Sequence, residues 1–479
     1  MRPLKNLQVP LDFQPSGLKI TEEHFARYEA ISRILDANPK MLELVHRDFE
    51  RARKEAEARA QAAQSRRSPK KNTPSRGFEY ETDTVFRMLL VQTLEGWSLR
   101  ETVVRIDDSG KLRRFTRLNL RSMLDYSTLC DLKNAIRSKT WRQINRVLGE
   151  YAVKEGRIEG EKLRLDTTLV ETNIHYPTDS SLLWDSYRKM DSWLRRVRRI
   201  DLAAVGESRL QPRRVKRLHV RIQRGSRKGS EEQRELYAKL ISAVEDVLTW
   251  VDPVRKKVEA RVASGSYSGG TLYQANALLR EWERYGPVIA RIVDQAQRRV
   301  LAGENVPNAE KVFSLYEDHT ELVKRGKAGK EVEFGHMVQI QQVEEKFITE
   351  YDVFRRRPDE PELIEVALAR HRELFGELPG CVAADRGYYR GMPEIRELEA
   401  KIDLVSIGKK GNRNADEAAR ESSAAFRLAQ AFRAGVEGTI SYLKRSLRLA
   451  RCFNKGWEHY QATVGITIVS HNLLILSRR

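Results

Sequence analysis

Three acidic residues occupy positions at which carboxylates can act together on a bound group. Asp166 lies inside EKLRLDTTLVETNIHY, Asp385 follows the short apolar run GCVAA, and Glu437 lies in AQAFRAGVEGTISYLKR. Three converging carboxylates repel one another unless a cation neutralises them. With two Mg²⁺ (or Mn²⁺) ions about 3.5–4 Å apart, such a set is suited to phosphoryl transfer by in-line displacement. These residues are therefore candidate metal ligands and catalytic residues.

Each carboxylate also has an ordinary explanation. A strand can carry Asp166 on a polar face that simply meets water. Arg433, Glu437 and Lys444 have spacings of four and seven, which put them on one helical face. Lys444 could then reach a phosphate, and Arg433 could orient Glu437 or bind the DNA backbone. The alternative is a surface ion pair between Arg433 and Glu437.

Other acidic residues and three histidines compete for the same roles. The acidic ones are Glu171, Asp179, Asp185 and the pair Glu317 and Asp318. Asp318 ends a predicted strand and is the first replacement for Asp385, whereas Asp179 is expected to cap a helix. His175, His319 and His336 are expected to form hydrogen bonds, because Mg²⁺ prefers oxygen ligands.

The elements that must position these residues predict a mixed sheet. Leu163, Leu165, Thr167 and Leu169 alternate with polar residues, a pattern typical of a strand. Further strands are predicted at 311–317, 333–341, 346–354, 380–384 and 401–407, with the second and third of these forming a hairpin. Helices are predicted at 361–375, 392–400, 415–446 and 457–476. The fold class expected is α+β (mixed α/β), a sheet with helices on its faces.

The rest of the chain is predicted to be helical. Helices are expected at 21–47, at 84–94 and at 127–147, and a further helix is expected to begin after Ser98, its N-cap. Three longer helices are then expected at 181–197, 231–263 and 270–301. Since strands precede and follow the last three, that block is an insertion within one domain. The break at EGW before Ser98, with Arg100 beyond it, is consistent with a DNA-reading helix-turn-helix or with an ordinary helical hairpin.

The charge balance indicates an acidic polymer as a partner. The chain has 479 residues, 87 Lys and Arg, and 67 Asp and Glu, for a net charge of +20. Nucleic acid is the first such polymer to consider, with ribosomal association or a membrane surface as alternatives. Residues 191–230 contain thirteen basic and three acidic residues, with the pairs Arg195 and Arg196, Arg198 and Arg199, and Arg213 and Arg214. We expect these pairs to bind DNA phosphates, and regard the basic stretch 51–77 equally as a phosphate contact or a solvated tether.

The remaining composition favours a cytoplasmic location. Three distant cysteines, Cys130, Cys381 and Cys452, offer neither a disulfide framework nor a zinc site. The N-terminus lacks the apolar core of a signal peptide. The apolar segment 461–476 is too short and too polar for a membrane span, and is expected to be a buried helix.

The three acidic segments carry a resemblance. LRLDTTLVETNIHYPTDSSLL, AADRGYY and FRAGVEGTISYLKRSLRLAR resemble the active-site blocks of bacterial insertion-sequence DDE transposases, closest to the ISNCY-like group and related to the IS-four and IS-five types. The resemblance implies an RNase H-like catalytic domain and assigns the catalytic triad to Asp166, Asp385 and Glu437. Arg433, Glu437 and Lys444 match the Y-(2)-R-(3)-E-(6)-K signature of related families, but Gln430 stands at the position of its tyrosine.

The resemblance also implies an organisation and partners. We expect a helical arm and basic linker at 1–77, a helical and possibly helix-turn-helix DNA-binding domain at 78–155, a catalytic domain at 156–177 plus 306–455, a basic insertion at 178–305, and a terminal helix at 456–479. The expected partner is double-stranded DNA, both transposon ends and target, bound by a homodimer associated with the nucleoid and with no membrane contact. A non-catalytic, decayed transposase and an RNase H-like nuclease without strand transfer are the alternatives.

Overall fold

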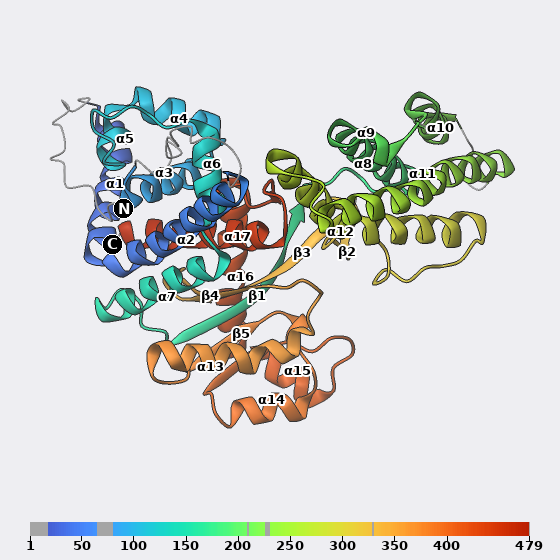
Figure 1. Cartoon of the computed structure of the whole chain (residues 1–479). Coiled ribbons are helices and arrows are strands. Elements are labelled where there is room, and N and C mark those ends of the chain that lie inside the picture. The colour runs from blue at the N-terminus through green and yellow to red at the C-terminus, as the bar shows by residue number, and fades with distance from the viewer. Residues whose placement is uncertain (1–17, 65–79, 208–209, 226–229, 328–329, 479) are drawn as a thin grey trace. The chain divides into compact units, whose positions relative to one another are not determined.

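The computed structural model describes residues 18–64, 80–207, 210–225, 230–327 and 330–478, which fold as two compact units (Figure 1). The first comprises residues 18–54, 80–171 and 336–478. The second comprises residues 55–64 and the described part of 172–335. Much of the predicted basic linker lies outside the described residues.

The first unit begins with helices. They are α1 (Lys19–Ala37), α2 (Pro39–Gln64), α3 (Thr82–Leu94), α4 (Leu99–Asp108), α5 (Gly110–Phe115), α6 (Tyr126–Ala135) and α7 (Ser138–Lys154). Ser98 caps α4 as predicted, because its side chain accepts a hydrogen bond from the amide of Glu101. The terminal helix α17 (Trp457–Ser477) packs against α7, α3 and α1, and is buried as expected.

Two of the predicted N-terminal helices are each divided in the structure. The helix expected at 21–47 breaks at Asn38, because Pro39 has no amide hydrogen and disfavours helical geometry in the residue before it. The helix expected at 127–147 breaks after Ala135, where Ile136 is extended and fully buried. The amide of Arg137 instead donates to Asp48 at 2.8 Å, which compensates the lost helical hydrogen bond.

The mixed sheet is confirmed, with strand order β2-β3-β1-β5-β6; β4 pairs with β3, and β7 with β1. The strands are β1 (Lys162–Thr172), β2 (Glu321–Lys327), β3 (Lys330–Val343), β4 (Ile348–Val353), β5 (Cys381–Ala384), β6 (Leu404–Ile407) and β7 (Arg451–Cys452). Strands β1, β5 and β6 are parallel, and β2, β3 and β4 are antiparallel. The predicted hairpin is β3 and β4, and the mixed α/β class is also confirmed.

The strand predicted at 311–317 is wrong. Val312 and Leu315 are buried in the core of the second unit rather than on a sheet face. The side chain of Gln295 accepts from the Val312 amide at 2.7 Å, so a side chain takes the place of a neighbouring strand. The strand instead starts at Glu321, four residues after the predicted strand ends.

Helices cover both faces of the parallel strands. Helices α13 (Leu363–Phe375) and α14 (Met392–Glu399) pack on the face that carries Leu163 and Leu165. Helix α16 (Ala424–Arg445), which follows α15 (Ala415–Ser422) after a break capped by Ser423, packs on the other face. The single helix expected at 415–446 is therefore two helices. Strand β1 is buried on both faces, so the expectation that Asp166 simply meets water is wrong.

The second unit is built around helices with a core of their own. They are α8 (Asp179–Ile200), α9 (Leu202–Val205), α10 (Pro212–Gly225), α11 (Glu231–Ala263), α12 (Gly269–Ala296) and the π-helical turn η2 (Gln297–Leu301) (Figure 1). The three long helices predicted here are confirmed. Thr178, rather than Asp179, caps α8, through a capping box with Ser181. No helix in the described parts of the chain has the length and apolar composition needed to cross a bilayer.

Candidate active site and basic surfaces

Strand register brings Asp166 and Asp385 together. In the parallel pair of β1 and β5, Leu165 is opposite Ala384, so Asp166 and Asp385 occupy the next position on each strand. Leu163 and Leu165 face α13 and α14, and side chains alternate along a strand, so Asp166 faces α16. The two carboxylates therefore lie side by side at the carboxyl end of β5, where sites in such sheets gather.

The environment of Asp166 disfavours its negative charge. Only 8% of the residue is exposed, and burial, followed by repulsion from Asp385 and Glu437, raises its pKa to about 6. Two contacts oppose this shift. The guanidinium of Arg433 lies 3.5 Å from Oδ2, and the amide of Thr167 donates to Oδ1 at 2.7 Å. A further cation near Asp166 would therefore stabilise the site.

The Asp385 side chain caps a short turn that follows β5. It is the N-cap of η4 (Arg386–Tyr388), and its Oδ1 accepts from the amide of Gly387 at 2.7 Å. This contact fixes the carboxylate at the strand end and leaves Oδ2 without a contact of this kind. The AADRGYY segment is thus a strand followed by a carboxylate-capped turn.

Arg433 links Asp166 to Glu437. Its Nη2 lies 3.0 Å from Glu437 Oε1, so the ion pair expected as the ordinary alternative is present, but the same guanidinium also faces Asp166. The Glu437 side chain is 67% exposed. Within the residues that the structure describes, no three His, Cys, Asp or Glu side chains are grouped closely enough to hold a metal ion. The structure therefore brings Asp166 and Asp385 together, whereas Glu437 is exposed and contacts Arg433. Lys444 is half-buried and lies two turns after Glu437 on α16.

A buried arginine that sequence reasoning missed fixes α16 on the sheet. Arg164 donates to Gln342 Oε1 at 2.8 Å and to the carbonyl of Phe432 at 2.6 Å, and its guanidinium lies over the Phe432 ring. Burial lowers the pKa of Arg164 to about 10. Gly435 makes this approach possible, because a Cβ there would overlap with Arg164 Nη1. The alternation of β1 was the signal, since it puts Arg164 on the same face as Asp166.

Gln430 has a structural role at the position of the signature tyrosine. Its Nε2 donates to the carbonyl of Ser406 at 2.7 Å and to the carbonyl of Ala384 at 3.3 Å. Ala384 immediately precedes Asp385. Gln430 therefore ties α16 to the ends of β5 and β6, next to the paired carboxylates.

A fourth carboxylate, Glu360, was also missed. It opens the short turn η3 (Glu360–Glu362), and its Oε1 accepts from Thr167 Oγ1 at 2.7 Å. A Cβ on Gly387 would overlap with the other carboxylate oxygen of Glu360. Glu360 thus contacts the neighbour of Asp166 and lies against the turn that Asp385 caps. No local pattern indicated it, because it follows a loop rather than a strand.

Tyr388 lies beneath these carboxylates. It is 1% exposed, and burial raises its pKa, with further increases from Asp166, Glu360 and Asp385. Its hydroxyl accepts from Gln339 Nε2 at 3.3 Å. One buried side chain is thus close to three acidic groups, which shows how densely negative charge is placed at this strand end.

The competing carboxylates have other partners. Glu171 pairs with Arg451 at 2.6 Å, and Glu317 lies 2.9 Å from His319. Asp179 binds Arg299 and Gln295, and Asp185 lies 3.6 Å from His175. Asp318 is exposed. His336 is buried, with its Nδ1 3.1 Å from the carbonyl of Phe354, in keeping with the expected hydrogen-bonding role.

The arginines predicted to bind DNA fall into two groups. Arg195 pairs with Asp191 at 2.8 Å, and Arg196 shares Glu281 with Lys189. The others, Arg198 and Arg199 at the end of α8 and Arg213 and Arg214 on α10, are exposed. Pairing with carboxylates, rather than exposure, therefore separates the two groups, since Arg195 is also exposed.

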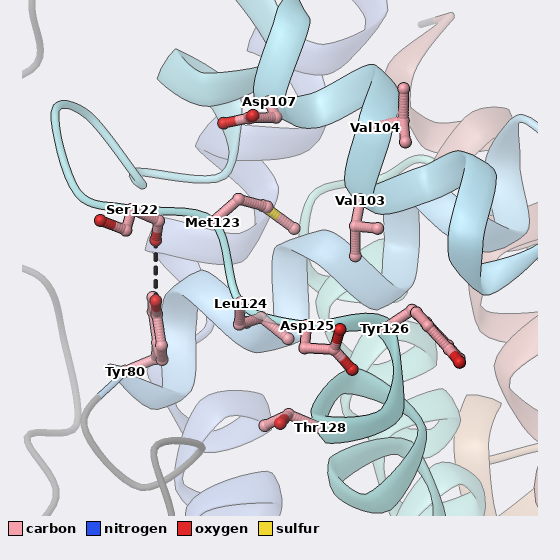
Figure 2. A pocket seen from close by; sticks show the side chains of 10 residues that line it. All are labelled: Tyr80, Val103, Val104, Asp107, Ser122, Met123, Leu124, Asp125, Tyr126 and Thr128. Atoms are coloured by element: carbon pink, nitrogen blue, oxygen red, sulfur yellow. Dashed lines mark hydrogen bonds between the residues drawn. The ribbon is translucent and has the colours of Figure 1, made fainter.

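The connection between α3 and α4 has the predicted turn, but α3 is almost wholly buried. Arg100 on α4 is exposed; it donates to the hydroxyl of Tyr126 at 3.0 Å and stacks over that ring. Figure 2 shows a pocket of about 610 Å³ beside α4, in which the Tyr80 hydroxyl donates to the carbonyl of Ser122. Val103, Val104, Met123 and Leu124 give this pocket apolar walls, and Asp107 and Asp125 give it negative charge. The pocket itself is therefore not a phosphate site.

One family model matches the chain. The family is described as Transposase domain (DUF772), and the match covers residues 65–135, of which the structure describes α3 to α6 and their connections from residue 80. No curated protein and no solved structure matches the chain. The match supports a transposase, a class of enzyme that acts on DNA.

Proposed function

We propose that the chain is a DNA transposase of the DDE type, nearest the ISNCY-like group, with an RNase H-like core. It would bind terminal inverted repeats and catalyse strand cleavage and strand transfer. The observation that carries the proposal is the pairing of Asp166 and Asp385 at neighbouring strand ends, facing the helix with Arg433 and Glu437. The transposase match in the N-terminal helices supports the same class.

The chemical type of the donor set suits two Mg²⁺ or Mn²⁺ ions, although the side chains are not grouped as a metal site among the described residues. All the groups are carboxylate oxygens, which these hard cations prefer. The raised pKa of Asp166 reflects burial and like charge, both of which a cation would offset. Asp166, Asp385 and Glu437 would hold the ions, with Glu437 turning from solvent. Two ions, when bound, supply activation of the attacking water or 3′-hydroxyl and stabilise the leaving oxygen.

The protein's own residues would orient that chemistry. The Thr167 and Gly387 amides hold one oxygen of Asp166 and of Asp385, which leaves Oδ2 of each to face the substrate. Arg433 neutralises Asp166 and Glu437 and would donate to a DNA phosphate once these carboxylates hold cations. Lys444 would bind a neighbouring phosphate. Glu360 would position the strand end through Thr167.

The wider assignment follows from this site. We propose that residues 156–177 and 306–455 form the catalytic domain, that 78–155 and the basic insertion at 178–305 contact DNA, and that a homodimer acts on paired ends at the bacterial nucleoid. A non-catalytic DNA-binding protein is the second candidate, and the exposure of Glu437 favours it.

The test is metal-dependent cleavage of a duplex that carries the inverted repeats flanking the gene. Asp166→Asn, Asp385→Asn and Glu437→Gln should each abolish cleavage and leave binding of the ends intact. Glu171→Gln is the matched control, because Glu171 lies on the same strand but pairs with Arg451. Full cleavage by any of the three variants would contradict the triad. Cleavage without joined products would identify a nuclease, and binding without cleavage by the unaltered protein a non-catalytic relative.

A further inference from the structure

Helix α10, in the second unit, carries a dense group of basic side chains without carboxylate partners in the described part of the chain. Between Glu207 and Glu231 the sequence contains nine Lys and Arg residues and no Asp or Glu. On α10 itself, Arg213, Lys216, Arg217 and Arg224 are exposed, and none of these four side chains forms a hydrogen bond or ion pair with another described residue. Clustered like charge of this kind destabilises a fold unless an anion neutralises it.

These cations form a stripe. Val215 and Ile222 are seven residues apart and bury one side of α10, which packs on α8 and α11. Arg213, Arg217 and Arg224 follow spacings of four and seven, which place them on the opposite side of the helix. With Lys216, Val220 and Arg221 they line a shallow groove of about 790 Å³. The buried and the basic sides are therefore separate surfaces of one amphipathic helix.

The stripe differs from the other arginines of the unit. Arg221 pairs with Glu232 at 2.8 Å, and Arg214 lines a different pocket together with Glu235 and Asp246. Arg195 and Arg196 on α8 have the carboxylate partners already described. The α10 stripe therefore gathers four exposed cations on one helix, whereas Arg198 and Arg199 form a smaller exposed pair at the end of α8.

We propose that the α10 stripe (Arg213, Lys216, Arg217 and Arg224) binds the phosphate backbone of double-stranded DNA independently of sequence. The proposal deepens the proposed function, since it takes DNA as the substrate. From Arg213 to Arg224 the helix advances about 16 Å, and a duplex strand presents a phosphate about every 3.4 Å along its axis. Four cations along that length match a run of about five phosphates. Guanidinium groups suit phosphate oxygens, and contacts to phosphates carry no sequence information.

The test compares two variants with the same change in net charge. One carries Arg213→Gln, Lys216→Gln, Arg217→Gln and Arg224→Gln. The control carries Lys239→Gln, Arg255→Gln, Lys256→Gln and Arg298→Gln, four cations of the same unit that have carboxylate partners. Binding of two unrelated duplexes is measured by fluorescence anisotropy at several salt concentrations, after circular dichroism shows that both variants are folded.

The plot of log affinity against log salt should become less steep in the stripe variant by about 3.6, because each of the four phosphate contacts contributes about 0.9. The loss should be equal on the two duplexes, and the control should change the slope by less than about 1. An unchanged slope in the stripe variant, or an equal loss in the control, would overturn the proposal. Loss on only one duplex would also overturn it. Cleavage depends on Asp166 and its neighbours, so a negative result for the α10 stripe would not contradict the proposed cleavage chemistry, which the Asp166→Asn experiment tests separately.

Discussion

The carboxyl end of β5 and the outer side of α10 both concentrate charge of one sign, but the protein treats the two differently. Asp166 and Asp385 are fixed by strand register and by amide donors, and burial shifts the pKa of Asp166. The cations of α10 are exposed side chains on one helix. Buried like charge requires a proton or a tightly held cation, whereas exposed like charge is offset by loosely held counterions that a polymer can release. The first arrangement suits chemistry and the second suits affinity.

The comparison predicts that the two regions can be disabled separately. Asp166→Asn should reduce metal-dependent cleavage by roughly a thousandfold or more, since transition-state stabilisation by metal is lost. Its duplex affinity in EDTA should stay within about twofold of the unaltered protein, because no α10 contact changes. The four-residue α10 variant should show the reverse pattern at saturating DNA. Cleavage assays and anisotropy on the same preparations measure both quantities, and parallel losses in both variants would contradict the separation.

A substitution of Glu360 tests whether the metal site includes a carboxylate besides Asp166, Asp385 and Glu437. Glu360→Gln keeps an acceptor for Thr167 Oγ1 but removes a negative charge beside Asp385. We expect about a tenfold weaker apparent affinity for Mg²⁺ in the cleavage assay, with the maximal rate largely recovered at high Mg²⁺. Glu362→Gln, at the other end of the same turn, is the control. A loss that excess Mg²⁺ does not reduce would point to a packing role instead.

Asp166 should also reduce stability in the absence of metal. Its folded pKa of about 6 lies above the unfolded value of 3.8, so the folded state holds its proton more tightly. The carboxyl group is thus without effect on stability below about pH 3.8, becomes increasingly destabilising between about pH 3.8 and 6, and exerts its full effect above about pH 6. In EDTA at pH 7, Asp166→Asn should raise the free energy of unfolding by about 1–3 kcal/mol.

Denaturation in urea at pH 7 and at pH 4 checks this sign. The gain of Asp166→Asn over the unaltered protein should be largest at pH 7 and nearly absent at pH 4. Adding Mg²⁺ should raise the melting temperature of the unaltered protein and leave that of the variant almost unchanged. A gain that is the same at both pH values would show that packing, rather than charge, separates the two proteins.

The sequence predicted what depends on local pattern and missed what depends on distant contacts. The start of α4 was predicted because Ser98 is a typical N-cap residue, and Asp385 was found because it follows a short apolar strand. Glu360 is brought to Thr167 by a fold that joins segments far apart in the chain, so no spacing reveals it. The wrong strand at 311–317 has the same cause, since Gln295 from α12 supplies the hydrogen bond that a neighbouring strand was expected to provide.

The smallest predicted effect concerns how α16 is held against the sheet. Gly435 and Gly438 lie one turn apart on this helix, but only Gly435 faces the buried guanidinium of Arg164. Gly435→Ala should cost about 1–3 kcal/mol, because the new methyl group displaces Arg164 from the Phe432 carbonyl and leaves buried polar groups without partners. Gly438→Ala meets no neighbour within 4 Å and should gain about 0.5–1 kcal/mol from helix propensity alone. If urea denaturation shows that the two substitutions change the free energy of unfolding in opposite directions, the buried charge of Arg164 helps to fix the position of α16. The exposed charges of α10 have no such role. Two stabilising substitutions would mean that Arg164 can move aside, and that other contacts, among them those of Gln430, hold α16 against the sheet.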